Sequence, residues 1–91
     1  MRYVYIIQSE KTGKYYIGSS GKLKRRLRQH NRGGTRSTKS GRPWKLVVYR
    51  RYEEGGDATK EEKRLKTLKG NREFKQVVKG EVAEWSKATV C

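Results

Sequence analysis

The chain begins with two short runs of β-forming residues that a tight turn can join. Residues 2–8 (Arg-Tyr-Val-Tyr-Ile-Ile-Gln) are rich in β-branched and aromatic types, and so are residues 15–19. The turn between them contains Gly13, which can take a positive φ that other residues resist. The pattern predicts an antiparallel hairpin, so the core must be built on a sheet. Alternation along the first strand places three side chains on one face: Tyr3, Tyr5 and Ile7.

One more strand and three helices are expected after the hairpin. Apolar residues recur with helical spacing over 22–31, and either Ser19 or Ser20 could cap that helix. Residues 44–52 are expected to form a third strand. Asp57 is a plausible N-cap for a helix over 58–69, and residues 72–79 are expected to form a shorter helix. The order β-β-α-β-α-α predicts an α/β (α+β) fold, with a small three-stranded antiparallel sheet flanked by helices.

Two segments are not assigned to regular structure. Residues 31–43 form a polar, basic stretch that is long for a connection in a small domain, and such loops are usually functional or mobile. Residues 80–91 are expected to be a marginal helix or a disordered tail, because Trp85 is their one large apolar residue. The prediction is therefore one domain over 1–79 and a C-terminal tail over 80–91 that the fold does not need.

The distribution of charge points to a polyanionic partner. The net charge is +15, and between Lys11 and Arg51 there are fourteen Lys and Arg residues and no Asp or Glu. A surface built only for solubility would usually mix the two signs. Nucleic acid is the expected partner, DNA first and RNA as a possibility.

The sequence suggests a cytoplasmic protein. It contains no apolar run of about 18 residues that could span a membrane. The N-terminus lacks the apolar core of a signal peptide, and Cys91 is the only cysteine, so no internal disulfide can form.

Two tyrosines, an arginine and a histidine are candidates for chemistry. Tyr5 and Tyr16 lie on the two hairpin strands, although strand tyrosines are commonly packing residues. A phenol titrates near ~10 and needs a positive neighbourhood to act as a base. Arg26 and His30 are neighbours at i and i+4 on one helix face. An arginine can hold a phosphate through two hydrogen bonds. A lone histidine is more often a packing or surface residue, and the position of His30 beside Leu23 and Leu27 allows packing too.

One carboxylate, Glu62, is expected to reach the same candidate site as the tyrosines, Arg26 and His30. On a helical wheel of 58–69, Glu61 falls near the centre of the apolar face and Glu62 at its edge. An edge carboxylate can reach a site on the sheet while its helix stays packed. In so basic a chain it could hold Mg²⁺, which one or two carboxylates, water and substrate phosphate commonly bind. The alternative is an ion pair between Glu62 and Lys66 at i and i+4.

These residues, in this order, resemble the GIY-YIG nuclease domain. The resemblance runs over roughly residues 2–78 and rests on Tyr3-Val4-Tyr5, Tyr16-Ile17-Gly18, Arg26 with His30, and Glu62. Tyr3-Val4 stands where the family has Gly-Ile. The resemblance implies the same sheet-and-helix architecture, selects Arg26 among the crowded cations of its helix, and selects Glu62. It also implies an asparagine after the helix over 58–69 that carries Glu62. Asn71 is the nearby candidate, although Gly70-Asn71 could equally end that helix.

The resemblance implies a metal-dependent DNA endonuclease, possibly structure-specific and linked to repair or recombination. Tyr5, with Tyr16 as a possible relay, would activate water, and His30 would position a phosphate or share in proton transfer. Mg²⁺ or Mn²⁺ on Glu62 and the Arg26 guanidinium would stabilise charge. The protein is expected to be a monomer, perhaps with a partner protein. The residues expected to contact nucleic acid are Gly18, Lys22, Arg25, Arg28, Arg32, Arg36, Lys39, Arg42 and Asn71.

The other reading is a non-catalytic nucleic-acid-binding module on the same scaffold. The presence of Tyr16, Arg26 and Glu62 together favours catalysis, because a decayed site should have lost at least one of them.

Overall fold

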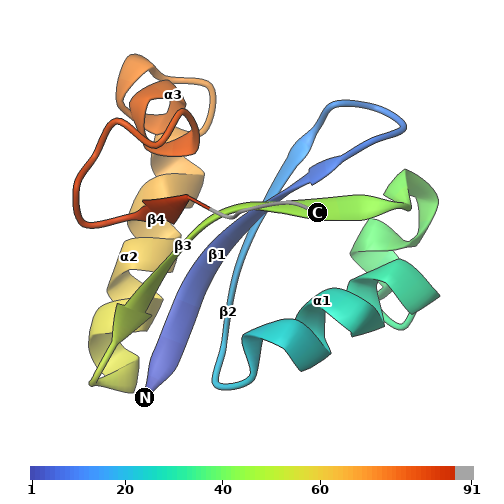
Figure 1. Cartoon of the computed structure of the whole chain (residues 1–91), viewed down its shortest axis with the longest axis horizontal. Coiled ribbons are helices and arrows are strands. Elements are labelled where there is room, and N and C mark those ends of the chain that lie inside the picture. Colours follow the sequence, from blue (N-terminus) through green and yellow to red (C-terminus); the bar gives the residue numbers. More distant parts are fainter. Residues whose placement is uncertain (88–91) are drawn as a thin grey trace.

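A computed structural model describes residues 1–87, apart from the side chain of Ser37 (Figure 1). Cys91, expected to be a tail residue, lies outside that range. The elements follow in this order: β1 Arg2–Ser9, β2 Tyr15–Ser20, α1 Leu23–Arg32, the 3₁₀ helix η1 Arg36–Gly41, β3 Trp44–Tyr52, α2 Gly55–Leu68, α3 Arg72–Val78 and β4 Ser86–Lys87. None of the described helices is long and apolar enough to cross a membrane.

The fold combines an antiparallel sheet with flanking helices, as the sequence predicts, but the sheet has four strands rather than three. Its order is β2-β1-β3-β4, so β1 is central and β2 forms one edge. The expected hairpin joins β1 and β2, and Gly13 takes φ 79° in its turn. The added strand β4 pairs with β3 through Val48–Lys87 and Tyr49–Ser86.

Helices cover both faces of the sheet (Figure 1). α2 and α3 lie on one face, where Val4 and Ile6 of β1 join an apolar core. α1 lies on the other face, where Tyr5 and Ile7 of β1 pack with Trp44. The alternation of side chains along β1 therefore divides the molecule into an α2/α3 face and an α1 face.

Three local expectations need correction. α2 begins at Gly55, so Asp57 lies in its first turn instead of capping it, where its negative charge still favours the helix terminus. The Ser20 hydroxyl accepts a hydrogen bond from the Lys22 backbone at 3.1 Å, but the N-cap of α1 is Lys22. The 31–43 stretch is not simply a loop, because η1 forms within it and Thr38 is fully buried.

The C-terminal segment does not match the expected helix or disorder where the structure describes it. Trp85 is 5% exposed and packs in the α2/α3 core with half-buried Val82 beside it. Ser86 and Lys87 form β4. The packing of Trp85 and Val82 and the pairing of β4 with β3 hold the segment on the fold, which its weak periodicity did not indicate. The boundary at residue 79 remains a prediction, and the burial of Trp85 argues against it.

Candidate active site at the edge strand

A buried hydrogen bond joins the first candidate tyrosine to the only histidine of the chain. Tyr5 is 1% exposed, and its hydroxyl lies 2.9 Å from Nε2 of His30, which is fully buried in the last turn of α1. The two rings meet edge to face at 5.9 Å. The Tyr16 ring also contacts His30 edge to face, at 5.0 Å. His30 is therefore the element that both tyrosines share.

Thr38 determines how His30 faces Tyr5. Nδ1 of His30 lies 2.8 Å from the Thr38 hydroxyl, and that hydroxyl donates its proton to the Thr35 carbonyl at 3.3 Å. Since a hydroxyl has one proton, it accepts from Nδ1–H, which leaves Nε2 as an acceptor for the Tyr5 hydroxyl. Burial, together with the charge of Arg26, lowers the pKa of His30 to about 4. His30 is therefore neutral near pH 7 and is assigned as a proton acceptor toward Tyr5.

The two tyrosines are not directly opposite each other. Tyr5 pairs with Gly18 and Tyr16 with Ile7, so the phenols share the α1 face on a diagonal. Burial raises the pKa of Tyr5, and the Arg26 guanidinium opposes that rise. Tyr5 consequently keeps its proton near neutral pH.

Gly18 makes room for Tyr5. A Cβ built at Gly18 would lie 2.6 Å from the Tyr5 hydroxyl oxygen and 2.8 Å from its Cζ, which is closer than real Cβ atoms come. Any side chain at Gly18 would displace the phenol ring. In the structure, the absence of a side chain at Gly18 leaves space for the Tyr5 ring. From the sequence, Gly18 was expected to contact nucleic acid.

Glu62 reaches the same edge of the sheet from α2. The Ser19 hydroxyl donates to its Oε1 at 2.6 Å, and Lys66 Nζ donates to its Oε2 at 2.9 Å. Burial alone would raise the pKa of Glu62, but these hydrogen bonds and the nearby cations bring it below the ordinary value. Glu62 is therefore charged at neutral pH, and its negative charge contributes to the raised pKa of Tyr5.

Glu61 confirms the predicted register of α2. It is 9% exposed and accepts hydrogen bonds from Tyr52 and Arg64, on the α2/α3 face away from Tyr5. The hydrogen bond from Arg64, opposed by burial, lowers the pKa of Glu61. Glu61 is thus the structural carboxylate, and Glu62 the one that stands at the edge.

Arg26 completes the group from α1. Its side chain is half-buried and donates to Gln29 Oε1 at 3.0 Å. Its charge acts on the pKa values of both Tyr5 and His30. Arg26 also lines a depression of about 220 Å³ with Ser20, Lys22 and Arg25, four residues on or next to the α1 N-terminus.

A family match now gives this arrangement its context. The model of the GIY-YIG catalytic domain matches residues 1–76. The chain belongs to the GIY-YIG family.

Relatives of two sizes resemble this GIY-YIG chain. A UPF0213 protein of Staphylococcus saprophyticus is 32% identical over 79 residues, which are 86% of this chain and 95% of that protein. A UPF0213 protein of Clostridium perfringens is 31% identical over 85 residues, 92% of this chain and 90% of that protein. The structure-specific endonuclease subunit slx1 of Schizosaccharomyces pombe is 48% identical over 53 residues, 50% of this chain but 20% of the subunit.

The residues of the GIY-YIG site fit a divalent cation held by one carboxylate. Glu62 is charged and 21% exposed, and the Lys66 ammonium on its outer oxygen is 54% exposed, so a cation could replace it. Residues 1–87 contain no cluster of three acidic, histidine or cysteine side chains. A site here would therefore complete its shell with water and substrate phosphate, as Mg²⁺ commonly does.

Two residues of this site were missed by sequence reasoning. Ser19 holds Glu62, and Thr38 orients His30. Nothing in the sequence pattern singles out Thr38, because it lies in the stretch expected to be a loop. The 3₁₀ helix η1 places Thr38 beside His30. Two hydrogen bonds hold η1 on the sheet: the Thr38 carbonyl accepts from Trp44 Nε1 at 2.7 Å, and the Gly41 carbonyl accepts from the Ser9 hydroxyl at 2.6 Å.

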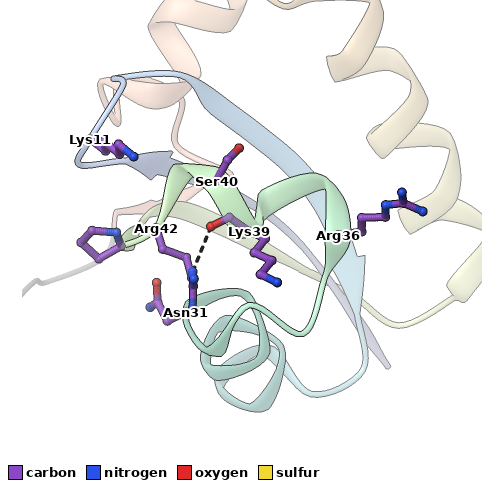
Figure 2. A pocket seen from close by; sticks show the side chains of 7 residues that line it. Lys11, Asn31, Arg36, Lys39, Ser40 and Arg42 are labelled. Carbon is purple, nitrogen blue, oxygen red and sulfur yellow. Dashed lines mark hydrogen bonds between the residues drawn. The ribbon is translucent and has the colours of Figure 1, made fainter.

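The cations expected to bind nucleic acid are spread around the α1 side. Figure 2 shows Lys39 of η1 close to Arg42 and Asn31, while the Arg36 side chain points away from them. They line an open depression of about 680 Å³ together with Lys11. Arg28 and Arg32 are exposed on α1. Asn71 stands apart: it is exposed, precedes α3, and follows Gly70, whose φ of 88° ends α2.

Proposed function

We propose that this chain is a metal-dependent endonuclease that hydrolyses phosphodiester bonds of DNA. The family match makes it a nuclease-type catalytic domain. The observation that carries the proposal is the hydrogen-bonded chain Tyr5–His30–Thr38. The charges of Arg26 and Glu62 act on its Tyr5 end.

The proton path runs through His30 in this proposal. A water attacking the phosphorus in line would give a proton to the Tyr5 oxygen as Tyr5 passes its own proton to Nε2 of His30. The neutral imidazole can accept that proton, and Thr38 holds the opposite nitrogen. His30 is fully buried and Tyr5 is 1% exposed, so the attacking water would reach the pair at the Tyr5 oxygen rather than at the imidazole. In this proposal His30 takes the relay that was expected of Tyr16, and the Tyr16 ring meets His30 edge to face.

Charge on the phosphate would be met from two elements. Arg26 on α1 would hold the phosphoryl oxygens, as guanidinium groups do bidentately. Glu62 and Ser19 would hold Mg²⁺ or Mn²⁺ at the β2 edge, and such a cation would stabilise the leaving oxygen. Lys22, Arg25 and the cations beside η1 would follow the strand through its phosphates.

The biological setting is proposed from the sequence and from the relatives. Structure-specific cutting is supported by the resemblance to the structure-specific endonuclease subunit slx1, which spans half of this chain. A role in repair or recombination is proposed from the family resemblance of the sequence. We propose a monomer that gains specificity from a partner protein, with the cytoplasm as its compartment.

One observation favours the alternative, a nucleic-acid-binding module without catalysis. Both oxygens of Glu62 already accept hydrogen bonds, from Ser19 and from Lys66. If Lys66 held its place with substrate bound, its ammonium charge would oppose a divalent cation at the same carboxylate.

The test is cleavage of nicked, branched, single-stranded and duplex DNA, with RNA as a further substrate, with and without Mg²⁺ or Mn²⁺. We expect metal-dependent cutting by the wild type and none by Glu62→Gln, which loses a stabilisation worth several kcal/mol while binding DNA at least as tightly. Glu61→Gln is the matched control. It should melt at a lower temperature, because Arg64 and Tyr52 lose the negative charge of their buried partner, yet still cut.

Two results would contradict the proposal. Normal cutting by Glu62→Gln would remove the carboxylate from the mechanism. A wild type that binds nucleic acid but cuts none of these substrates would establish the binding module instead.

A further inference from the structure

An apolar depression adjoins the candidate active site and has no role in the reaction proposed above. It measures about 450 Å³ and lies between α1 and the strands β1 and β3. Five apolar or aromatic residues line it: Tyr3 from β1, Leu23 and Leu27 from α1, and Leu46 and Tyr49 from β3. All five side chains are only half-buried, unlike the packed residues on the α2/α3 face.

Aromatic groups and cations are combined in this depression. The Tyr3 and Tyr49 rings meet edge to face at 6.2 Å. Exposed Lys22, Lys24 and Arg25 stand along its α1 side. Glutamate and aspartate are missing from its lining. An apolar, aromatic surface beside positive charge is the combination that binds unstacked bases of nucleic acid, because the rings take the base and the cations take its phosphates.

The depression is continuous with the place where the reaction would occur. Lys22 and Arg25 line both this depression and the smaller one that Arg26 lines. Tyr3 also shares its strand face with Tyr5, two residues further along β1. A nucleotide with its phosphate at Arg26 therefore has an apolar surface within reach of its neighbour's base.

We propose that this depression, lined by Tyr3, Tyr49 and the α1 leucines, receives an unstacked nucleobase next to the phosphate that is cut. The base site rests on the proposed function and specifies its substrate further. That substrate must offer an unpaired nucleotide beside the phosphate that is cut. A continuous duplex offers one only after a base is taken out of its stack. A second copy of this chain is a poorer occupant, because two such surfaces would bring their lysines and arginines together.

The experiment compares two ligands and four proteins without a divalent metal, so that nothing is cut. One ligand is a short single-stranded oligonucleotide, and the other has the same length and phosphates but carries abasic residues throughout. The wild type should bind the first about 5- to 100-fold more tightly, as base stacking on aromatic side chains typically contributes. Fluorescence anisotropy gives both affinities.

Tyr49→Leu and Tyr3→Leu are the test variants, and Tyr15→Leu is the matched control. Both test variants should bind the two ligands with nearly equal affinity, while their salt dependence stays that of the wild type. Tyr15 packs edge to face on Phe74 on the opposite face at 5.5 Å, so Tyr15→Leu should keep the full preference for bases. As a check that needs no variant, 2-aminopurine in the oligonucleotide should change its fluorescence on binding the wild-type protein.

The failures are distinguishable. If the wild type binds both ligands equally, or if Tyr49→Leu and Tyr3→Leu keep its preference, the depression does not take a base, although nucleic-acid binding stands. If Tyr49→Leu abolishes a concentration-dependent dimer, the occupant is a second copy and our proposal is overturned. If the wild type binds neither ligand, the proposed function fails together with the base site.

Discussion

The two faces of one small sheet are packed by different rules. On the α2/α3 face, Val4, Ile6 and Leu65 are fully buried among other apolar side chains. On the α1 face, Tyr5 is equally buried, but its neighbours include His30 and Thr38, which are buried and polar. Successive residues of β1 serve the two faces alternately. In a small domain, one strand thus contributes both to stability and to the candidate chemistry.

The polar face is stable only because its groups satisfy one another. No buried side-chain nitrogen or oxygen among the described residues lacks a hydrogen-bond partner. Each buried polar group left unpaired costs about 1–3 kcal/mol. The α2/α3 face depends on shape and apolar area, so the two faces should fail in response to different perturbations.

The largest effect should come from removing Trp85. We expect Trp85→Ala to lose about 3–5 kcal/mol of unfolding free energy, as buried tryptophans do, and the melting temperature to fall by more than about 10 °C. A chain that ends at Lys79 should show a similar loss, contrary to what the sequence predicted. Differential scanning calorimetry measures both.

Leu27→Ala is the control on the α1 face. Leu27 is half-buried beside an open depression, so its truncation leaves a smaller cavity and should cost clearly less. An equal loss in the two variants, or full stability of the shortened chain, would remove the contrast between the faces.

Much of this contrast could be read from the sequence. Alternating residues at 3–7 placed Tyr5 and Ile7 on one face, and the helical wheel of α2 separated Glu61 from Glu62. Local periodicity carries such information. The burial of Trp85, the part played by Thr38 and the diagonal arrangement of the tyrosines depend on contacts between distant residues and on strand register, which no local pattern specifies.

Mild acid should weaken the α1 face first. The pKa of His30 is lowered to about 4, so between about pH 6.5 and 4 the unfolded chain binds a proton that the folded chain does not. The free energy of unfolding is therefore at its full value above about pH 6.5, and it decreases as the pH falls toward 4. We expect a loss of about 2 kcal/mol between pH 7.5 and pH 5.

Because His30 is the only histidine, the control is direct. His30→Gln should be less stable at pH 7.5 but nearly insensitive to pH between 7.5 and 5. Thermal melts of both proteins at a series of pH values measure this. A wild type whose melting temperature is flat over that range would show that His30 is not held neutral in the fold.

The smallest effect should appear in the salt dependence of DNA binding. If about five phosphates are neutralised, log K should fall with log salt at a slope near −4 to −5. Lys39→Ala, in η1, or Arg42→Ala, directly after it, should make the slope shallower by about one. Lys60→Ala and Lys63→Ala, exposed on α2, should leave it unchanged. Equal changes from both sets would mean that DNA does not prefer the α1 side.

The same deletion of one hydroxyl on each face tests the division between chemistry and packing most directly. Tyr5→Phe and Tyr15→Phe each keep a ring in the same hairpin, one on the α1 face and one against Phe74. Initial rates of metal-dependent DNA cleavage should fall ~10²–10⁴-fold in Tyr5→Phe, as loss of general-base help typically causes, and stay near wild type in Tyr15→Phe. Full activity in a correctly folded Tyr5→Phe would contradict the central role of the Tyr5–His30 pair.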